Sequence, residues 1–173
     1  QLGDQLAEQG DHVIYFSLEQ SKLEMVSKSL SRTSAKLDLN NAVTSISIRN
    51  SDKKSATLIN LMDSYRETAS RMNIVEGNSD TNVDTIRGYV EKYARVNKVN
   101  PVVIVDYLQI MPSPDAKMNE QQKTDYNVMQ LKRMSRDLKI PVIVISSINR
   151  ANYSAPIDFE SFKASGGIEY TAD

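Results

Sequence analysis

Three short apolar runs are each followed directly by side chains that could do chemistry. The runs are 12–17 (HVIYFS), 102–106 (VVIVD) and 142–147 (VIVISS). The polar groups at their ends are Glu19, Asp106, Gln109, Ser147, Asn149 and Arg150. A carboxylate at a strand tip can orient a hydrated magnesium ion, and a carboxylate on a neighbouring strand can polarise an attacking water. The pattern predicts a site for nucleotide hydrolysis, although many acidic residues after strands only belong to turns.

Parallel strands between helices would bring these groups together. The runs 102–106 and 142–147 are almost wholly β-branched, which indicates strands covered on both faces. Ser21 and Glu24 can form a capping box that begins one helix, and apolar spacing predicts further helices at about 58–72, 83–93 and 123–139. A short strand is predicted at 72–75, whereas 36–50 and 111–122 fit neither pattern. The alternation predicts an α/β fold, in which ligands bind beyond the carboxyl ends of the strands.

The composition excludes several classes of site and partner. The 173 residues contain no cysteine and one histidine, His12, which excludes disulfides, thiolate metal sites and sites built from several histidines. No apolar run approaches the roughly 20 residues that span a bilayer, and no signal peptide is recognised. The net charge of −1 argues against nucleic-acid binding by overall positive charge. Basic groups on a single face stay compatible with DNA binding.

Four segments resemble motifs of the DnaB-type hexameric replicative helicases, in the order and approximate spacing of that family. Residues 101–111 (PVVIVDYLQIM) resemble the Walker B motif, and 16–21 (FSLEQS) resemble the strand end that carries the catalytic glutamate. Residues 144–150 (VISSINR) resemble the phosphate-sensing motif, and 161–173 (SFKASGGIEYTAD) a segment of the form SGxIExxAD. The resemblance implies a RecA-like P-loop NTPase core, with a mostly parallel sheet flanked by helices. Residues 1–173 would form a single partial domain, truncated at both ends.

The resemblance also implies a role for each matching residue. Glu19 would be the general base for water, and Asp106 would hold Mg²⁺ through water. Gln109, Ser147 and Arg150 would take part in nucleotide or phosphate sensing, Gln109 by supporting the strand end. Candidate DNA or subunit contacts are Lys163, Ser165, Gly166 and Gly167.

The family implies cofactors and partners as well. These are ATP and Mg²⁺, single-stranded DNA, and further copies of the protein in a homo-hexameric ring. A helicase loader and primase are further candidate partners. No membrane contact is expected. The location would be the cytoplasm, in a protein of bacterial, phage or plasmid origin.

The chain departs from the family in four places. Ser147 stands where the family usually has glutamine. Lys163 stands where the family often has arginine, and a lysine keeps the positive charge but cannot bind in the bidentate geometry of arginine. No GxxxxGK[ST] loop occurs in the chain, and the family's downstream arginine finger is absent. The resemblance therefore predicts that these 173 residues alone neither bind ATP tightly nor hydrolyse it. In the family the strand of the missing loop lies beside the sensor strand, so 142–147 is expected to present an unpaired apolar edge that forms dimers or aggregates.

Other functions share some of these features. Without the resemblance, Glu19 would be an ordinary acid at a helix N-terminus, favoured there by the macrodipole. A RecA-like recombinase or a clock-type ATPase shares the fold and the Walker B arrangement, but 107–109 and 165–173 favour the helicase. A domain that has lost catalysis could serve instead as an oligomerisation or loader-binding module.

Overall fold

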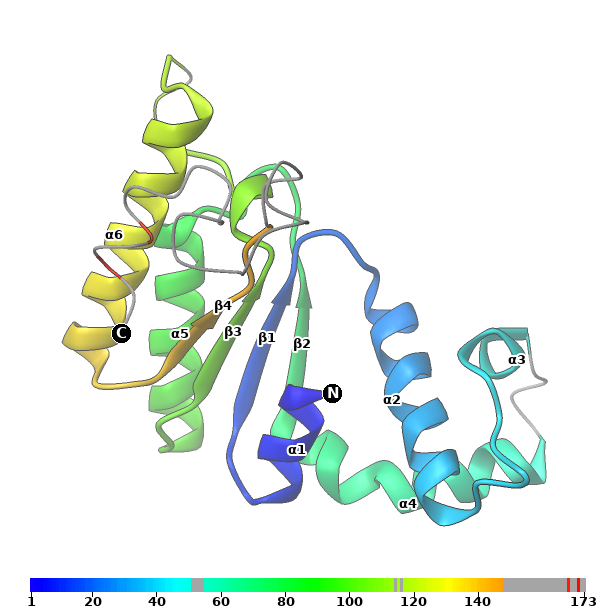
Figure 1. The fold of residues 1–173 in the computed structure, drawn as a ribbon. Coiled ribbons are helices and arrows are strands. Elements are labelled where there is room, and N and C mark those ends of the chain that lie inside the picture. Colours follow the sequence, from blue (N-terminus) through cyan, green and yellow to red (C-terminus); the bar gives the residue numbers. More distant parts are fainter. Residues whose placement is uncertain (51–54, 114, 116, 148–167, 169–170, 172–173) are drawn as a thin grey trace.

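A parallel β-sheet between two layers of helices forms the centre of the computed structural model, which describes residues 1–50, 55–113, 115, 117–147, 168 and 171 (Figure 1). Within the described residues the sheet has four strands in the order β2-β1-β3-β4, and all its pairings are parallel. The strands are β1 (Val13–Ser17), β2 (Met72–Glu76), β3 (Val102–Asp106) and β4 (Val142–Val144). The helices are α1 (Leu2–Glu8), α2 (Lys22–Leu37), α3 (Ser45–Asn50), α4 (Ala56–Arg71), α5 (Val83–Asn97) and α6 (Glu120–Leu138), with a 3₁₀ turn η1 (Leu108–Ile110).

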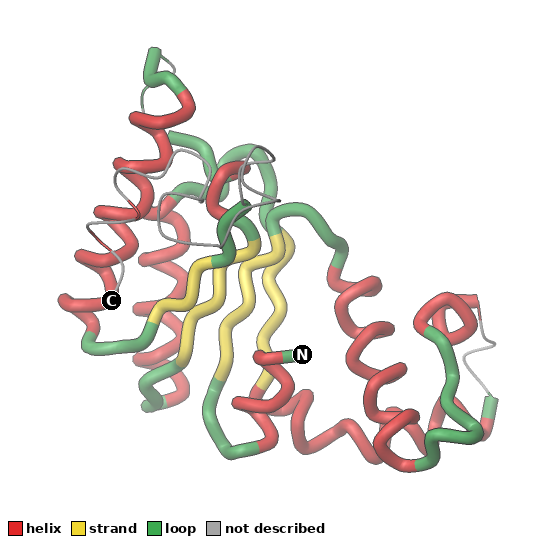
Figure 2. The backbone as a smooth tube through the Cα atoms, in the orientation of Figure 1, coloured by secondary structure: helices red, strands yellow, loops and turns green. Residues whose placement is uncertain are grey.

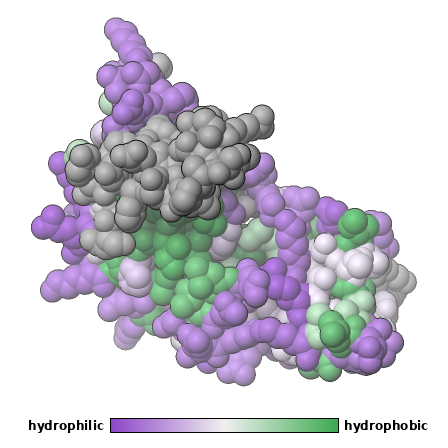
Figure 3. Space-filling view, viewed as in Figure 1, coloured by the Kyte–Doolittle hydropathy of each residue, from purple (hydrophilic) through white to green (hydrophobic). Residues whose placement is uncertain are grey.

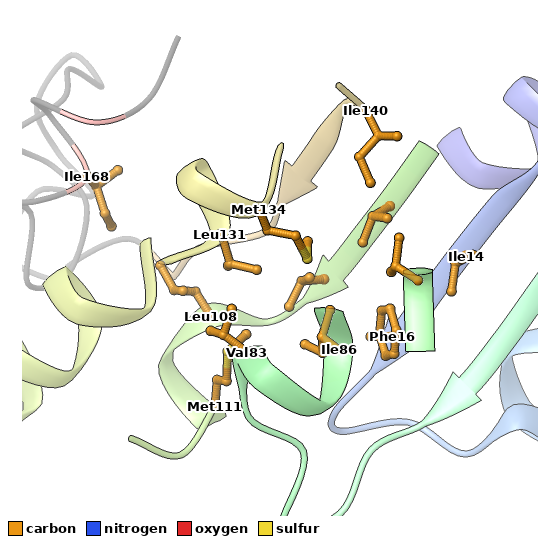
Figure 4. Close-up of a cluster of buried hydrophobic side chains, with 13 residues drawn as sticks. Ile14, Phe16, Val83, Ile86, Leu108, Met111, Leu131, Met134, Ile140 and Ile168 are labelled. Atoms are coloured by element: carbon orange, nitrogen blue, oxygen red, sulfur yellow. The ribbon is translucent and has the colours of Figure 1, made fainter. Parts of the chain in front are cut away.

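The central strands β1 and β3 are buried on both faces, which explains their almost unbroken apolar sequence. On one face, Ile14, Phe16 and Val103 pack with residues of α5 and α6 such as Ile86 and Met134 (Figure 4). The opposite face of the sheet packs against α1 and α2. Helices α2, α3 and α4 also share a separate small core of Leu30, Ile48, Leu61 and Tyr65. Helices thus cover both faces of the sheet (Figure 2). The parallel pairing puts the carboxyl ends of all four strands at the same edge.

The connections between strands change direction at the middle of the sheet. The chain leaves β1 through α2, α3 and α4 and returns as β2 on one side of β1. It leaves β3 through α6 and returns as β4, on the side away from β1. In open α/β sheets, ligands bind in the crevice beyond the carboxyl ends at such a reversal. The topology therefore selects the ends of β1 and β3 as the candidate site.

The predicted elements are confirmed with shifts at their ends. The capping box of Ser21 and Glu24 begins α2, and the short strand predicted at 72–75 is β2. Helix α6 starts at Glu120 rather than near 123, because Asn119 and Gln122 form a second capping box. Part of the stretch 36–50, which was expected to be irregular, forms α3, whose Ile48 is buried against α2 and α4. No helix among the described residues is long and apolar enough to cross a membrane.

Strand β4 ends the sheet in the described part of the chain. It pairs with β3 on one side, is half-exposed, and adjoins a hydrophobic area visible over β3 and β4 (Figure 3). The N–H of Ile145 donates to Val105 O at 2.9 Å. Since N–H groups along a strand point alternately to either side, the N–H of Val144 points away from β3.

Dimerisation through this edge stays a prediction, and proline substitutions test it. Val144→Pro should block pairing at the edge of β4 that faces away from β3, and keep the ladder to β3. We expect the wild-type 173-residue chain to form dimers or larger species and Val144→Pro to be monomeric, as measured by light scattering after gel filtration. Ile143→Pro is the control, because its N–H faces β3 and the variant should lose stability. A monomeric wild-type chain would contradict the prediction.

Candidate active site

The carboxyl ends of three neighbouring strands bring together the predicted site residues that the structure describes. Ser17 at the end of β1 pairs in register with Asp106 at the end of β3, and Val105 pairs with Val144 in β4. The backbone continues this pairing, since Leu18 N donates to Asp106 O at 2.7 Å. Glu19, Asp106, Gln109 and Ser147 therefore follow adjacent strands at the same edge, as the sequence predicts.

Glu19 lies in a turn that its neighbours hold. The Ser17 hydroxyl donates to Gln20 O at 2.6 Å and accepts from Gln20 N at 3.2 Å. Beyond the turn, Lys22 N donates to the carboxylate of Glu76 at the end of β2. Glu19 itself is exposed, and within the described residues its carboxylate has no hydrogen-bond or ion-pair partner. The turn thus fixes the backbone of Glu19, while its exposed carboxylate can contact a water molecule beyond the carboxyl ends of the strands.

Asp106 ends β3 as a half-buried carboxylate, and the peptide bond that follows it is cis. Its Oδ2 accepts a hydrogen bond of 2.5 Å from the hydroxyl of Tyr15 in β1. Its Oδ1 has no hydrogen-bond partner among the residues that the structure describes. One oxygen is thus engaged by the fold and the other is available to a ligand.

Gln109 in η1 connects the ends of β3 and β4. Its Nε2 donates to Ser146 Oγ at 2.7 Å, and its Oε1 accepts from Ser147 N at 3.2 Å. The backbone adds a bond from Leu108 N to Ile145 O at 2.9 Å. The amide side chain of Gln109 therefore joins η1 to the segment after β4 by two hydrogen bonds. These bonds are consistent with its predicted role of supporting the strand end.

Removing this amide should loosen the segment after β4. Gln109→Ala removes two hydrogen bonds, each worth about 1 kcal/mol. We expect the amide of Ser147 to exchange with solvent about 10-fold faster or more in hydrogen-exchange measurements. Gln121→Ala, on the exposed surface of α6, is the matched control and should change nothing. Equal protection of Ser147 in both variants would show that the side chain does not hold the segment.

Between the ends of β1 and β4 the site offers one strand-end carboxylate, Asp106, which suits a metal that keeps most of its water. No group of three or more His, Cys, Asp or Glu side chains that could hold a metal occurs in the described residues. Mg²⁺ typically binds through one or two carboxylates together with substrate phosphates and several waters. Asp106 Oδ1, which has no partner in the part of the chain that the structure describes, fits that mode and does not fit an all-protein cage.

Five of the predicted site residues lie outside the described residues, and two contacts at the site were not predicted. Arg150, Lys163, Ser165, Gly166 and Gly167 lie outside the described residues. The contact of Tyr15 with Asp106 was not predicted, because Tyr15 lies within the apolar run 12–17 and its sequence position resembles that of any buried strand residue. The Ser146 hydroxyl was missed as well, although the Ser146–Ser147 pair closing an apolar run is a usable signal of a polar strand end.

Comparisons with known proteins find one matching domain family and several similar proteins. The family model for the DnaB-like helicase C-terminal domain matches residues 2–173. The replicative DNA helicase DnaB of Helicobacter pylori strain J99 is 29% identical over 170 residues, covering 93% of this chain and 32% of that protein. The chain spans about a third of the length of the curated relatives that it matches.

Two solved structures share its fold. A DnaB-like replicative helicase, studied with its interactions with primase, has a TM-score of 0.82 and 22% identity, covering 99% of this chain and 42% of that chain. A structure described as an ATPase domain has a TM-score of 0.80 and 23% identity, covering 99% and 60%. The parallel sheet flanked by helices thus has the RecA-like fold of these two structures.

Proposed function

The chain belongs to the family of DnaB-like helicase C-terminal domains, and we propose that it is one part of an ATP-driven motor that moves a replicative helicase along single-stranded DNA. In this proposal residues 1–173 are a single partial RecA-like domain of a longer protein. The longer protein would hydrolyse ATP with Mg²⁺ and unwind duplex DNA. The Ser17–Asp106 pairing carries the proposal, because it brings the Glu19 turn and the Asp106 carboxylate to the reversal point of the sheet.

The proposed chemistry assigns separate tasks to the two carboxylates. Glu19 accepts a proton from the water that attacks the γ-phosphate. The hydrogen bonds between Ser17 and Gln20 fix the turn that carries Glu19. Asp106 would hold hydrated Mg²⁺, with Oδ1 as the oxygen that has no partner among the described residues. Bound Mg²⁺ would offset the negative charge that develops on the phosphate oxygens. Gln109 keeps the end of β4 in register with the end of β3, so that Ser147 and Arg150 can respond to the phosphate.

A phosphate-binding loop has to come from outside these 173 residues. The chain contains no GxxxxGK[ST] sequence, and without such a loop's amides and lysine the phosphates would have no cradle. We therefore expect the 173 residues alone to show no ATP turnover. The hexameric ring, the loader, the primase and the cytoplasmic location belong to the proposal for the longer protein. The proposed DNA or subunit contacts are Lys163, Ser165, Gly166 and Gly167.

Strand displacement by a full-length protein that carries these residues tests the proposal. We expect unwinding of a forked DNA duplex that requires ATP and Mg²⁺, together with ATP turnover that single-stranded DNA stimulates. A folded hexamer that contains a GxxxxGK[ST] loop but shows neither activity would contradict the motor. That result would favour the non-catalytic oligomerisation or loader-binding module.

A further inference from the structure

Tyr15 contacts the candidate metal-binding carboxylate from the neighbouring strand. Its Cα partner in β3 is Ile104, two residues before Asp106. Since side chains two residues apart on a strand point to the same face, Asp106 lies on the face of the sheet that Tyr15 occupies. The hydroxyl of Tyr15 reaches diagonally to Asp106 Oδ2, at 2.5 Å.

The surroundings fix Tyr15 as the donor in this contact. The side chain is 8% exposed and packs with Val13, Ile74 and Ile104 beneath α1 and α2. A phenol keeps its proton at neutral pH and a carboxylate can only accept, so Tyr15 is the donor and Asp106 Oδ2 the acceptor. A rigid β-strand and a packed ring thus present a single O–H to a carboxylate at the sheet edge.

We propose that Tyr15 is a positioning residue, which holds Asp106 in one orientation through Oδ2 and leaves Oδ1 to the hydrated metal. The inference rests on the proposed function of Asp106. Hydrogen-bond partners of metal-binding groups orient them, and removing such a partner typically costs about 10- to 100-fold in metal affinity or activity. Tyr15 acts through Asp106, so its loss should weaken the response to metal more than the maximal rate.

The chain offers a matched control for this contact in Tyr65. Tyr65 is 6% exposed and donates to the carboxylate of Asp4 at 2.8 Å, in the helical layer between α1, α2 and α4. Tyr65→Phe and Tyr15→Phe therefore remove the same kind of bond from equally buried rings. Only Tyr15→Phe alters a carboxylate at the candidate site.

The first test measures the orientation of Asp106 without nucleotide or metal. Three-bond NMR couplings to Asp106 Cγ report its χ1 angle in the 173-residue chain. We expect couplings of one rotamer in the wild type and in Tyr65→Phe, and averaged couplings in Tyr15→Phe. Unchanged couplings in Tyr15→Phe, or the same change in both variants, would overturn the proposal.

The second test measures the metal dependence in the full-length protein. The Mg²⁺ concentration for half-maximal ATP turnover should rise about 10-fold in Tyr15→Phe, with the maximal rate within about 3-fold of the wild type. Mn²⁺ binding in the presence of a non-hydrolysable ATP analogue, followed by electron paramagnetic resonance, should weaken by the same factor. An unchanged metal dependence in an active enzyme would overturn the inference alone. Absence of turnover in the wild type would overturn the proposed function, and the NMR couplings would still decide whether Tyr15 orients Asp106.

Discussion

Glu19→Gln and Asp106→Asn are each expected to lower ATP turnover of the full-length protein by at least about 100-fold. A positioned general base contributes about 10²- to 10⁴-fold, and Glu19→Gln removes the basic oxygen without changing the size of the side chain. Asp106→Asn removes the charge that is proposed to hold hydrated Mg²⁺, in a reaction whose catalysis is mostly positioning and charge stabilisation. Steady-state turnover with and without single-stranded DNA measures both effects.

Asp80→Asn is the matched control for these two variants. Asp80 lies in the exposed loop after β2, at the same edge of the sheet. We expect its turnover to stay within about 3-fold of the wild type. If Asp80→Asn lost as much activity as Glu19→Gln, the effect would be a general loss of negative charge, and the assigned roles would be wrong.

Asp4→Ala is expected to destabilise the chain by about 3 kcal/mol, the second large effect that the structure predicts. Asp4 is 5% exposed in α1 and accepts hydrogen bonds from Ser29, Arg32 and Tyr65. Removing it leaves the hydroxyl protons of Ser29 and Tyr65 without their acceptor, at about 1–3 kcal/mol each. It also leaves the Arg32 guanidinium, which is only about one-third exposed, without its carboxylate partner. The melting temperature should fall by roughly 10 °C, since about 1 kcal/mol shifts it by roughly 2–4 °C in a domain of this size.

The contribution of Asp4 to stability should decrease at acidic pH. Burial would raise the pKa of Asp4, but the bonds from Arg32, Tyr65 and Ser29 outweigh burial and lower it. A carboxyl whose folded pKa lies below its unfolded value of about 4 stabilises the fold above that pH. The stabilisation is lost as the pH falls through the folded pKa. The difference in unfolding free energy between wild type and Asp4→Ala should therefore be constant above about pH 5 and shrink below about pH 4.

Glu8→Ala is the control for Asp4→Ala, on the same helix. Glu8 also pairs with a basic residue of α2, Lys36, but both side chains are substantially exposed, at 39% and 55%. Exposed pairs contribute little, so we expect a change of about 0.5 kcal/mol or less in denaturant unfolding. Equal losses in Glu8→Ala and Asp4→Ala would show that burial of the network does not stabilise α1.

The sequence predicts the strands of this fold better than its helical layer. Strands β1 and β3 are predicted because two-sided burial leaves an almost continuous apolar sequence, and the capping box at Ser21 marks the start of α2. Helix α3 was not predicted, because its six residues are too few to show a helical period and it depends on burying Ile48 against α2 and α4. The network around Asp4 joins residues 25 to 61 positions apart, a pairing that no local pattern contains.

The same distinction applies to the candidate site. Glu19, Asp106 and Gln109 were predicted because each lies at the end of an apolar strand or within three residues of it, and parallel pairing brings such ends together. Tyr15 was not predicted, because its contact with Asp106 depends on which strand lies beside β3 and in which register. Strand order is a property of the tertiary fold, and the order β2-β1-β3-β4 places residue 15 next to residue 106.

The identity of the nucleotide bound to the Glu19→Gln variant tests the central claim most directly. If Glu19 is the base for the attacking water and Asp106 supports binding, the full-length variant should bind ATP with Mg²⁺ and fail to cleave it. After incubation with ATP and removal of free nucleotide, chromatography of the denatured protein should recover ATP. Recovery of ADP, at the level that the wild type gives, would contradict the assignment of this sheet edge as the hydrolytic site.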